Sequence, residues 1–346
     1  MSSQPTQSTG AISSSRAFAE RFDTMVANIG KVIKGKDTVV RQALVALLSE
    51  GHVLFEDMPG TGKTVLARAI GATISGENSR IQCTPDLLPA DVTGSTVLDR
   101  STGEFTFRRG PVFGNVLLAD ELNRATPKTQ SALLEAMAEK RVTFDGVTYD
   151  LPAPFFVLAT MNPIELAGTF PLPEAQLDRF QFKLVVGYAD RDAEVEVLRA
   201  NQAQAAITAL EPVVDIPQVV EMIDWAKGVT ISDPILFYIT DLVQATRSDP
   251  ALLMGASTRA AEALMRASRV MAASQGRDDV LPDDVKLLAD AVLNHRLLLT
   301  PDAQLREEQV SAVIDRILHR VKVPQGLRRE SSVASDSSTE PLVATS

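Results

Sequence analysis

A glycine-rich turn between an apolar run and a helical pattern is the first sign of chemistry in this chain. The turn reads Gly60-Thr-Gly-Lys-Thr64 and follows the apolar run His52–Glu56. Glycines let backbone N–H groups curl around phosphates, and the start of a helix adds positive potential there. Lys63 would reach the β and γ phosphates, and the Thr64 hydroxyl would bind Mg²⁺. The turn therefore predicts a site for ATP and Mg²⁺, and the alternative is a plain turn before an ordinary helix.

The loop departs from the strict motif G-x-x-x-x-G-K-[ST] at its first position, where this chain has Asp57. The departure concerns the turn out of the strand and leaves the phosphate cradle intact. Aspartate adopts unusual backbone angles more readily than most residues, so the turn remains feasible. The whole loop is expected to contact the nucleotide, namely Asp57, Met58, Pro59, Gly60, Thr61, Gly62, Lys63, Thr64 and Val65.

Two adjacent carboxylates, Asp120 and Glu121, end the apolar run that begins at Val116. In a parallel α/β sheet, ligands bind beyond the C-terminal ends of the strands. Asp120 is therefore expected to share the Mg²⁺ ion with Thr64, and Glu121 to polarise the attacking water as a general base. A solvated turn after a strand is the alternative for this pair.

A polar residue, Asn162, follows the next apolar run, which ends in Ala159-Thr-Met-Asn-Pro163. Its position at a neighbouring strand end would let the amide orient the same water. An Asn-Pro pair is also an ordinary turn signal, so this role competes with a purely structural one.

The elements that position these residues alternate between short apolar runs and helical patterns up to about residue 190. Strands are expected at residues 52–56, 80–83, 116–119, 155–160 and 180–186, and helices at 36–50, 63–75 and 127–139. Buried runs of this length between helices predict an α/β fold with a mostly parallel five-stranded sheet, covered on both faces.

The second part of the chain shows helical patterns without strands. Helices are expected at residues 191–202, 218–227, 233–247, 257–274, 282–293 and 306–319. The predicted organisation is a disordered tail over 1–16, a core over 17–189, an all-α domain over 190–322 and a second disordered tail over 323–346, because both ends are rich in small polar residues.

Composition narrows the function classes. The 346 residues include 34 basic and 44 acidic side chains, a net charge of −10, which disfavours a broad nucleic-acid surface. Cys83 is the only cysteine, so neither an intrachain disulfide nor a thiolate metal cluster is expected. The sequence has no secretory leader and no apolar run of about 18 residues, which predicts a cytoplasmic protein without a membrane span.

Two segments inside the core predict β-hairpins. The first, near residues 93–109, turns at Asp99–Gly103, and the second, near 141–149, turns at Asp145-Gly146. The basic side chains of the first are Arg100, Arg108 and Arg109, which would bind an acidic client or form a solvated edge.

Taken together, four segments resemble the MoxR family of AAA+ ATPases. They are LLADELNRATPKTQSALLEAM over 117–137, ATMNP over 159–163, LPEAQLDRF over 172–180 and GASTRA over 255–260. The similarity covers about residues 25–320. It implies a P-loop core, a helical lid, and homo-hexameric rings with ATP between subunits, and the two hairpins match insertions of that family.

The resemblance also implies roles for three residues. Arg179 would be an arginine finger that reaches a neighbour's nucleotide, and Arg259 would be a sensor on the lid that touches the γ-phosphate in the same subunit. Arginine suits both roles because its fixed charge can meet the charge that develops in phosphoryl transfer. Ile33 lies in the segment that packs against adenine in this family. A solvated cation is the alternative for each arginine, and an ordinary loop for Ile33.

The function that the resemblance implies is chaperone-like remodelling of client protein complexes, including maturation and metal or cofactor insertion, driven by ATP hydrolysis. A partner with a von Willebrand factor A domain is expected on the same ground. The alternatives are a chelatase-type motor subunit, a nucleic-acid motor, which the net acidity disfavours, and a nucleotide-sensing scaffold with little turnover.

Overall fold

The computed structural model describes residues 12–98, 101, 103–163, 168–189, 191–192, 194–195 and 209–324. Several expectations concern residues outside these ranges. They include Asp99 and Arg100 in the first hairpin turn, most of the helix expected at 191–202, residues 1–11 of the N-terminal tail, and residues 325–346.

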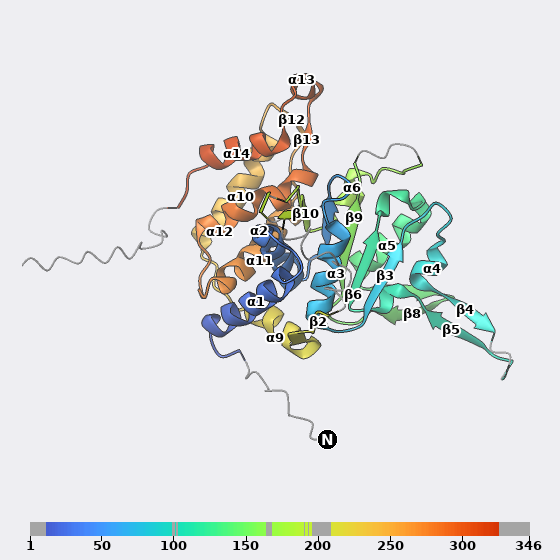
Figure 1. The fold of residues 1–346 in the computed structure, drawn as a ribbon. Helices are drawn as coiled ribbons and strands as arrows, with labels where there is room; N and C mark the ends of the chain where they lie inside the picture. The colour runs from blue at the N-terminus through green and yellow to red at the C-terminus, as the bar shows by residue number, and fades with distance from the viewer. Residues whose placement is uncertain are drawn as a thin grey trace, which may run out of the picture.

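Five parallel strands form the central sheet (Figure 1). Across the sheet their order is β10 (Phe182–Leu184), β1 (Val53–Glu56), β9 (Phe156–Met161), β6 (Val116–Asp120) and β3 (Asn78–Gln82). The expected five-stranded parallel sheet is confirmed, and the continuous apolar runs of β1, β6 and β9 are buried, as strands between two helical layers are. The bounds of two strands differ most from the expectation, since 80–83 becomes 78–82 and 180–186 shortens to 182–184, whereas the other three strands differ by one residue at one or both ends.

The strands reach a common edge at their C-terminal ends. The register places Glu56 of β1 opposite Met161 of β9, and Gln82 of β3 opposite Asp120 of β6. Side chains at and just after these positions therefore meet along one edge of the sheet, where ligands of such folds bind.

The sheet separates two hydrophobic cores. Helices α2 (Asp37–Leu48) and α3 (Lys63–Thr73) contribute to one of them, and α5 (Pro127–Glu139) contributes to the other. Successive side chains of a strand point to opposite faces. Leu54 of β1 accordingly packs in the α5 core, while the residues on either side of it pack in the core that α2 and α3 share.

An N-terminal helix, α1 (Ser15–Gly30), packs beside the C-terminal helices (Figure 1). It buries a regular apolar stripe that starts at Phe18, and the Ser14 hydroxyl caps its first turn. Ile12 is also buried. The composition predicts a tail over residues 1–16, whereas residues 12–16 lie in the folded part, so that boundary was wrong.

The C-terminal part is helical, as expected for the lid. Its longer helices are α9 (Ile216–Lys227), α10 (Asp233–Arg247), α11 (Thr258–Ser274), α12 (Pro282–Leu293) and α14 (Val310–Arg320), with the one-turn segments η3 (Asn294–Arg296) and α13 (Pro301–Leu305). The bounds expected for α5, α10 and α12 are confirmed, whereas the helix expected at 306–319 begins only at Val310.

Strands do not stop at residue 190, contrary to the sequence pattern. The two-residue strand β11 (Val214–Asp215) pairs in parallel with β2 (Ile74–Ser75), directly after α3. Two further short strands, β12 (Leu252–Met254) and β13 (Leu298–Leu299), pair antiparallel within the lid. These strands are too short to produce an alternating pattern, so the sequence carries no signal for them.

Both predicted hairpins form antiparallel pairs. The pair β4 (Gly94–Leu98) and β5 (Phe105–Arg109) extends away from the body of the molecule and follows the short helix α4 (Pro89–Thr93) (Figure 1). The second pair consists of β7 (Arg141–Phe144) and β8 (Val147–Asp150).

The two hairpins meet through aromatic rings. Phe107 of β5 stacks on Tyr149 of β8 with ring centroids 4.6 Å apart, and it contacts Phe144 of β7 at 5.1 Å. Pairs at these separations stabilise a contact beyond the area that they bury. We call these three rings the aromatic joint.

In the part of the chain that the structure describes, no helix has the length and apolar character needed to cross a membrane.

Candidate nucleotide site

The loop between β1 and α3 has the conformation that a phosphate cradle needs. Gly60 and Gly62 have φ angles of 82° and 87°, in the left-handed region that favours glycine. Gly62 directly precedes the first turn of α3, so the free N–H groups of that turn open toward the loop. The Lys63 ammonium lies within the loop, where it donates to Met58 O at 2.8 Å and also to Asp57 O.

Asp57 fits its position for a reason other than the expected one. Its φ is not positive, so the turn out of β1 makes no demand for glycine. Its buried carboxylate accepts hydrogen bonds from the N–H of Met58, at 2.7 Å, and from the N–H of Gly187. Asp57 therefore ties the start of the phosphate loop to the segment that follows β10.

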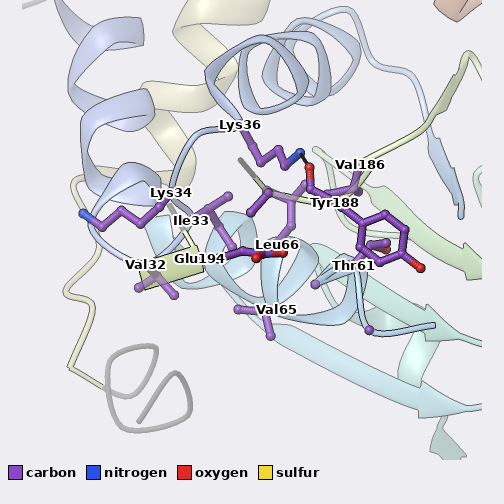
Figure 2. Close-up of a pocket in the computed structure, with 13 residues that line it drawn as sticks. Val32, Ile33, Lys34, Lys36, Thr61, Val65, Leu66, Val186, Tyr188 and Glu194 are labelled. Atoms are coloured by element: carbon purple, nitrogen blue, oxygen red, sulfur yellow. Dashed lines mark hydrogen bonds between the residues drawn. The ribbon is translucent and has the colours of Figure 1, made fainter. Parts of the chain in front are cut away.

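A cavity of about 410 Å³ opens beside the loop (Figure 2). It brings together five residues expected to contact the nucleotide, which are Ile33, Gly60, Thr61, Gly62 and Val65. Its walls also carry Val32, Leu66 and Val186, so it offers an apolar space beside a phosphate loop. Such a combination suits a purine base next to its phosphates.

Several lining residues were missed from the sequence, and two of them follow β10. These two are Val186 and Tyr188, and the Lys36 ammonium donates to Tyr188 O at 2.6 Å (Figure 2). The available signal was their place after the strand that neighbours β1, because residues at adjacent strand ends converge.

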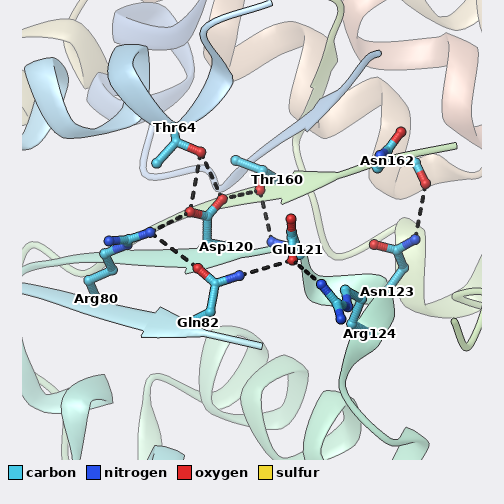
Figure 3. A network of polar contacts seen from close by, with 9 residues as sticks. All are labelled: Thr64, Arg80, Gln82, Asp120, Glu121, Asn123, Arg124, Thr160 and Asn162. Atoms are coloured by element: carbon cyan, nitrogen blue, oxygen red, sulfur yellow. Dashed lines mark hydrogen bonds and ion pairs between the residues drawn. The ribbon is translucent and has the colours of Figure 1, made fainter. Parts of the chain in front are cut away.

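Asp120 is held in a buried network at the C-terminal end of β6 (Figure 3). Its Oδ1 accepts from the Thr64 hydroxyl at 2.9 Å and from the Thr160 hydroxyl at 2.6 Å. Its Oδ2 forms an ion pair with Arg80 at 2.9 Å. The structure thus brings together Thr64 and Asp120, as expected of two ligands of one cation.

The donor set fits Mg²⁺. A carboxylate and a hydroxyl beside a phosphate loop are the hard oxygen ligands that Mg²⁺ shares with phosphates and water. Within the described ranges, no three His, Cys, Asp or Glu side chains gather as a possible metal site.

Glu121 has a backbone conformation unusual for its residue type, with φ 55° and ψ 50°. Its N–H donates to the Thr160 hydroxyl at 2.9 Å, and its carboxylate accepts from Gln82 at 3.0 Å and from Arg124 at 2.9 Å. Thr160 therefore contacts both members of the acidic pair (Figure 3).

Four members of this network were missed from the sequence, namely Arg80, Gln82, Arg124 and Thr160. Gln82 could have been predicted from its register with Asp120, because the two residues are opposite each other in the paired strands. Arg80 lies two residues before Gln82, so its side chain is on the same face of the sheet. Neither relation is visible until the strands are paired.

The thiol of Cys83 lies near the acidic pair without serving as a nucleophile. Burial, with smaller contributions from the Asp120 and Glu121 charges, raises the pKa of Cys83 to about 12. The thiol stays protonated at neutral pH, and the thiolate is the reactive form.

Asn162 lies after β9 and is buried. Its backbone carbonyl accepts from the Asn123 amide at 3.1 Å, whereas its own Oδ1 has no hydrogen-bond partner among the described residues. A buried amide oxygen normally has a partner, so this atom suits a water or ligand contact. The structure records no hydrogen bond between this side chain and Asp120 or Glu121.

The two expected catalytic arginines lie together in another place. Arg179 and Arg259 line a second cavity, of about 270 Å³, together with Lys140, Asp178 and Arg266. Arg259 forms an ion pair with Asp178 at 3.0 Å, and 65% of its side chain is exposed.

Arg259 does not line the cavity beside the phosphate loop, and neither do Lys63 and Thr64, so the lining of this cavity does not test the expected contact with the γ-phosphate. Helix α11 docks on the core through Ala263, whose carbonyl accepts from the Gln181 amide at 3.2 Å. This contact, with the Asp178 ion pair, places the start of α11 beside Arg179.

Comparisons with known proteins agree with this architecture. Residues 52–182 match the ATPase family associated with various cellular activities (AAA), and residues 244–317 match the AAA lid domain. A crystal structure from Cytophaga hutchinsonii, provisionally described as an ATPase, superposes with a TM-score of 0.83 at 39% identity, covering 90% of this chain and 97% of that one.

Curated relatives extend over most of the chain. The uncharacterized protein YeaC of Bacillus subtilis is 47% identical over 299 residues, 86% of this chain and 93% of that protein. Chaperone MoxR1 of Mycobacterium tuberculosis is 39% identical over 318 residues, 89% of this chain and 84% of that protein. The protein MoxR of Paracoccus denitrificans is 32% identical, with 88% and 96% covered. With its phosphate loop, parallel sheet and helical lid, this chain belongs to the MoxR family of AAA+ ATPases.

Proposed function

We propose that this chain hydrolyses ATP, with Mg²⁺, at the interfaces of a homo-hexameric ring, and uses the cycle to remodel client protein complexes. The observation that carries the proposal is that the expected catalytic arginines lie apart from the phosphate loop and the acidic pair. The phosphate loop, Asp120 and Glu121 lie at one edge of the sheet, whereas Arg179 and Arg259 line a different cavity. A site divided in this way is completed when a second subunit supplies the arginines.

Within one subunit, the chain binds and orients the nucleotide. Ile33 and Val65 line the apolar cavity in which the base would lie, and the loop N–H groups with Lys63 would hold the phosphates. Thr64 and Asp120, which contact each other at 2.9 Å, would hold Mg²⁺, and the ion would neutralise phosphate charge.

Glu121 and Asn162 act on the attacking water. Glu121 accepts its proton, and the Asn162 amide orients it, which agrees with the unpartnered Oδ1 of that side chain. Arg179 and Arg259 of the adjacent subunit meet the charge that develops on the phosphoryl group. Arg259 thus acts between subunits and not within its own.

Client contact is assigned to the hairpins. Phe105 is 75% exposed and Leu98 is 47% exposed near the end of the β4–β5 pair, and Val147 is 51% exposed in the β7–β8 pair. Leu98 and Phe105 are opposite each other in the β4–β5 pair and so form a continuous apolar patch, and such patches mark protein-binding surfaces. The name of the relative Chaperone MoxR1 supports a chaperone-type activity, and a von Willebrand factor A-domain protein is the proposed partner.

The test is ATPase activity over a series of protein concentrations, with Glu121→Gln, Arg179→Ala and Arg259→Ala, and with Arg41→Ala as a control on a surface ion pair. Specific activity is expected to rise with concentration, and the first three variants are expected to lose most of it. ATP binding without hydrolysis at every concentration would favour a nucleotide-sensing scaffold. Full activity of dilute monomers would contradict catalysis between subunits.

A further inference from the structure

Arg296, on η3 of the lid, is a buried cation that contacts the segment carrying Arg179. Its Nε donates to the Asp178 carboxylate at 2.7 Å. Its Nη2 donates to Phe180 O at 2.8 Å and Asp178 O at 3.2 Å, and its Nη1 donates to Gln181 O at 3.0 Å. One guanidinium from the lid therefore holds the backbone on both sides of Arg179.

Other lid groups hold the same segment. His295 contacts Phe180 O through Nε2 at 2.9 Å, and the Gln181 amide reaches Ala263 O of α11. Arg179 itself is exposed, and its recorded hydrogen bond is a long one of 3.4 Å to Leu134 O. The lid thus fixes where this side chain starts while its guanidinium stays accessible.

The electrostatics of Arg296 point to a role in positioning. Burial lowers the pKa of Arg296, and the hydrogen bond that Arg296 donates to Asp178 opposes that shift. A buried ion pair is a poor source of stability, because apolar side chains of similar volume often do as well. A planar fork with five donors, however, can satisfy a carboxylate and several carbonyls in one fixed geometry.

Asp178 links the two arginines assigned to the adjacent site. Its Oδ1 pairs with Arg296, its Oδ2 pairs with Arg259 at 3.0 Å, and Arg179 is the next residue in the chain. A shift of η3 and α11 relative to the core would therefore move Arg179 and Arg259 together.

We propose that Arg296 is a positioning residue, which with Asp178 sets the direction of Arg179 and Arg259 toward the nucleotide of the adjacent subunit. The inference rests on the proposed function, because it assumes that these arginines act between subunits. Its consequence is that the lid of one subunit governs hydrolysis in its neighbour's site.

The test is a mixing experiment with full-length protein. Arg296→Gln retains its own Glu121, and Glu121→Gln retains a correctly held Arg179. Each variant alone is expected to lose at least about tenfold in kcat, as the loss of one transition-state contact does. In a 1:1 mixture, about a quarter of the interfaces of a randomly assembled ring would combine an intact Glu121 with a correctly held Arg179. Activity well above the sum of the two variants is therefore expected.

A control mixture separates this inference from the proposed function. Arg179→Ala mixed with Glu121→Gln tests only whether the arginine acts between subunits. No recovery in that mixture would overturn the proposed function, and this inference with it. Recovery there, but only summed activity with Arg296→Gln, would overturn the role of Arg296 alone.

Two further variants guard against misfolding. If Arg296→Gln fails to form rings in sedimentation, Asp178→Asn takes its place, because it removes the charge from the link but leaves the backbone contacts of Arg296. The same recovery is expected, and its absence would contradict the proposal. Arg296→Lys keeps the positive charge but is expected to lose kcat as Arg296→Gln does, since one ammonium cannot span the carboxylate and three carbonyls. Wild-type kcat in Arg296→Lys would overturn the positioning role.

Discussion

Arg80 forms a 2.9 Å ion pair with Asp120, on the carboxylate that the Thr64 hydroxyl also contacts. The carboxylate proposed to bind Mg²⁺ is thus already shared with a cation from the neighbouring strand. A bound Mg²⁺ has to compete with this arginine for one of its oxygens.

Removal of Arg80 is therefore expected to strengthen Mg²⁺ binding. In Arg80→Gln, the Mg²⁺ concentration for half-maximal nucleotide binding should fall about threefold to tenfold, a modest effect because half of the Arg80 side chain is exposed. The measurement is a Mg²⁺ titration of fluorescent nucleotide binding. Arg41→Gln, which alters a surface pair with Asp23, should leave the midpoint in place. A rise of the midpoint in Arg80→Gln would mean that Arg80 assists the nucleotide.

The hydroxyl of Thr160 is expected to matter for turnover more than for folding. Thr160→Val keeps the shape of the side chain but removes its bonds to Asp120 and to the Glu121 N–H. We expect kcat to fall about tenfold or more, because each of these bonds holds a group of the reaction site. Steady-state ATPase assays would measure it, with Thr160→Ser as the variant that keeps the hydroxyl. Equal loss in both variants would argue against the hydroxyl.

Conversion of Asp57 to glycine, which restores the strict loop motif, should weaken nucleotide binding. Asp57→Gly removes the contact with Gly187 and with it the link between the loop and the wall at Tyr188. The KM for ATP is expected to rise about threefold to tenfold, from the loss of one charge-assisted hydrogen bond. Asp57→Asn keeps an oxygen acceptor, so its KM for ATP should lie between that of the parent chain and that of Asp57→Gly. Unchanged or tighter binding in Asp57→Gly would show that the link has no such role.

Acid is expected to destabilise the chain through His52. Its Nδ1 accepts from the Val157 N–H at 3.0 Å, which leaves the proton on Nε2 toward Met137 O at 3.3 Å. Burial lowers the pKa of His52 to about 4, so between about pH 6.5 and 4 the unfolded chain binds the proton and the folded chain does not. The free energy of unfolding should fall over this window by up to about 3 kcal/mol.

Urea unfolding at pH 7, 5.5 and 4.5 would measure this effect. His52→Asn is expected to be less stable at pH 7 but to lose less stability on acidification. Some pH dependence should remain, because burial also lowers the pKa of His295. The matched control is His319→Asn, which changes an exposed histidine and should leave the pH dependence of the free energy of unfolding unchanged. An identical pH slope in His52→Asn and the parent chain would contradict the assignment.

The features that could be predicted from the sequence each lie within one short segment of the chain. The phosphate loop and the pair Asp120-Glu121 are contiguous motifs, each next to a strand of its own, so a linear pattern contains them. The same holds for the bounds of α5, α10 and α12, whose apolar spacing and first-turn prolines are all within one segment.

The contacts that could not be predicted from the sequence depend on pairing between distant segments. Arg80 meets Asp120 only because β3 lies beside β6, and Arg296 meets Asp178 only because the lid docks on the core. Arg259 illustrates the same limit, since a residue's motif does not say which subunit's nucleotide it faces. Helix α1 is a different case, because it was not predicted at all although its apolar stripe at Phe18, Phe22 and later positions lies within one segment.

The aromatic joint has a consequence for spectroscopy. Tyr149 lies against the face of Phe107 at 4.6 Å, so ring currents should displace the NMR signals of its ring protons from those of a solvent-exposed tyrosine. The chain has three tyrosines, which makes this resonance readily assignable. A single tyrosine signal would thus report, during turnover, whether two hairpins from distant parts of the core remain joined.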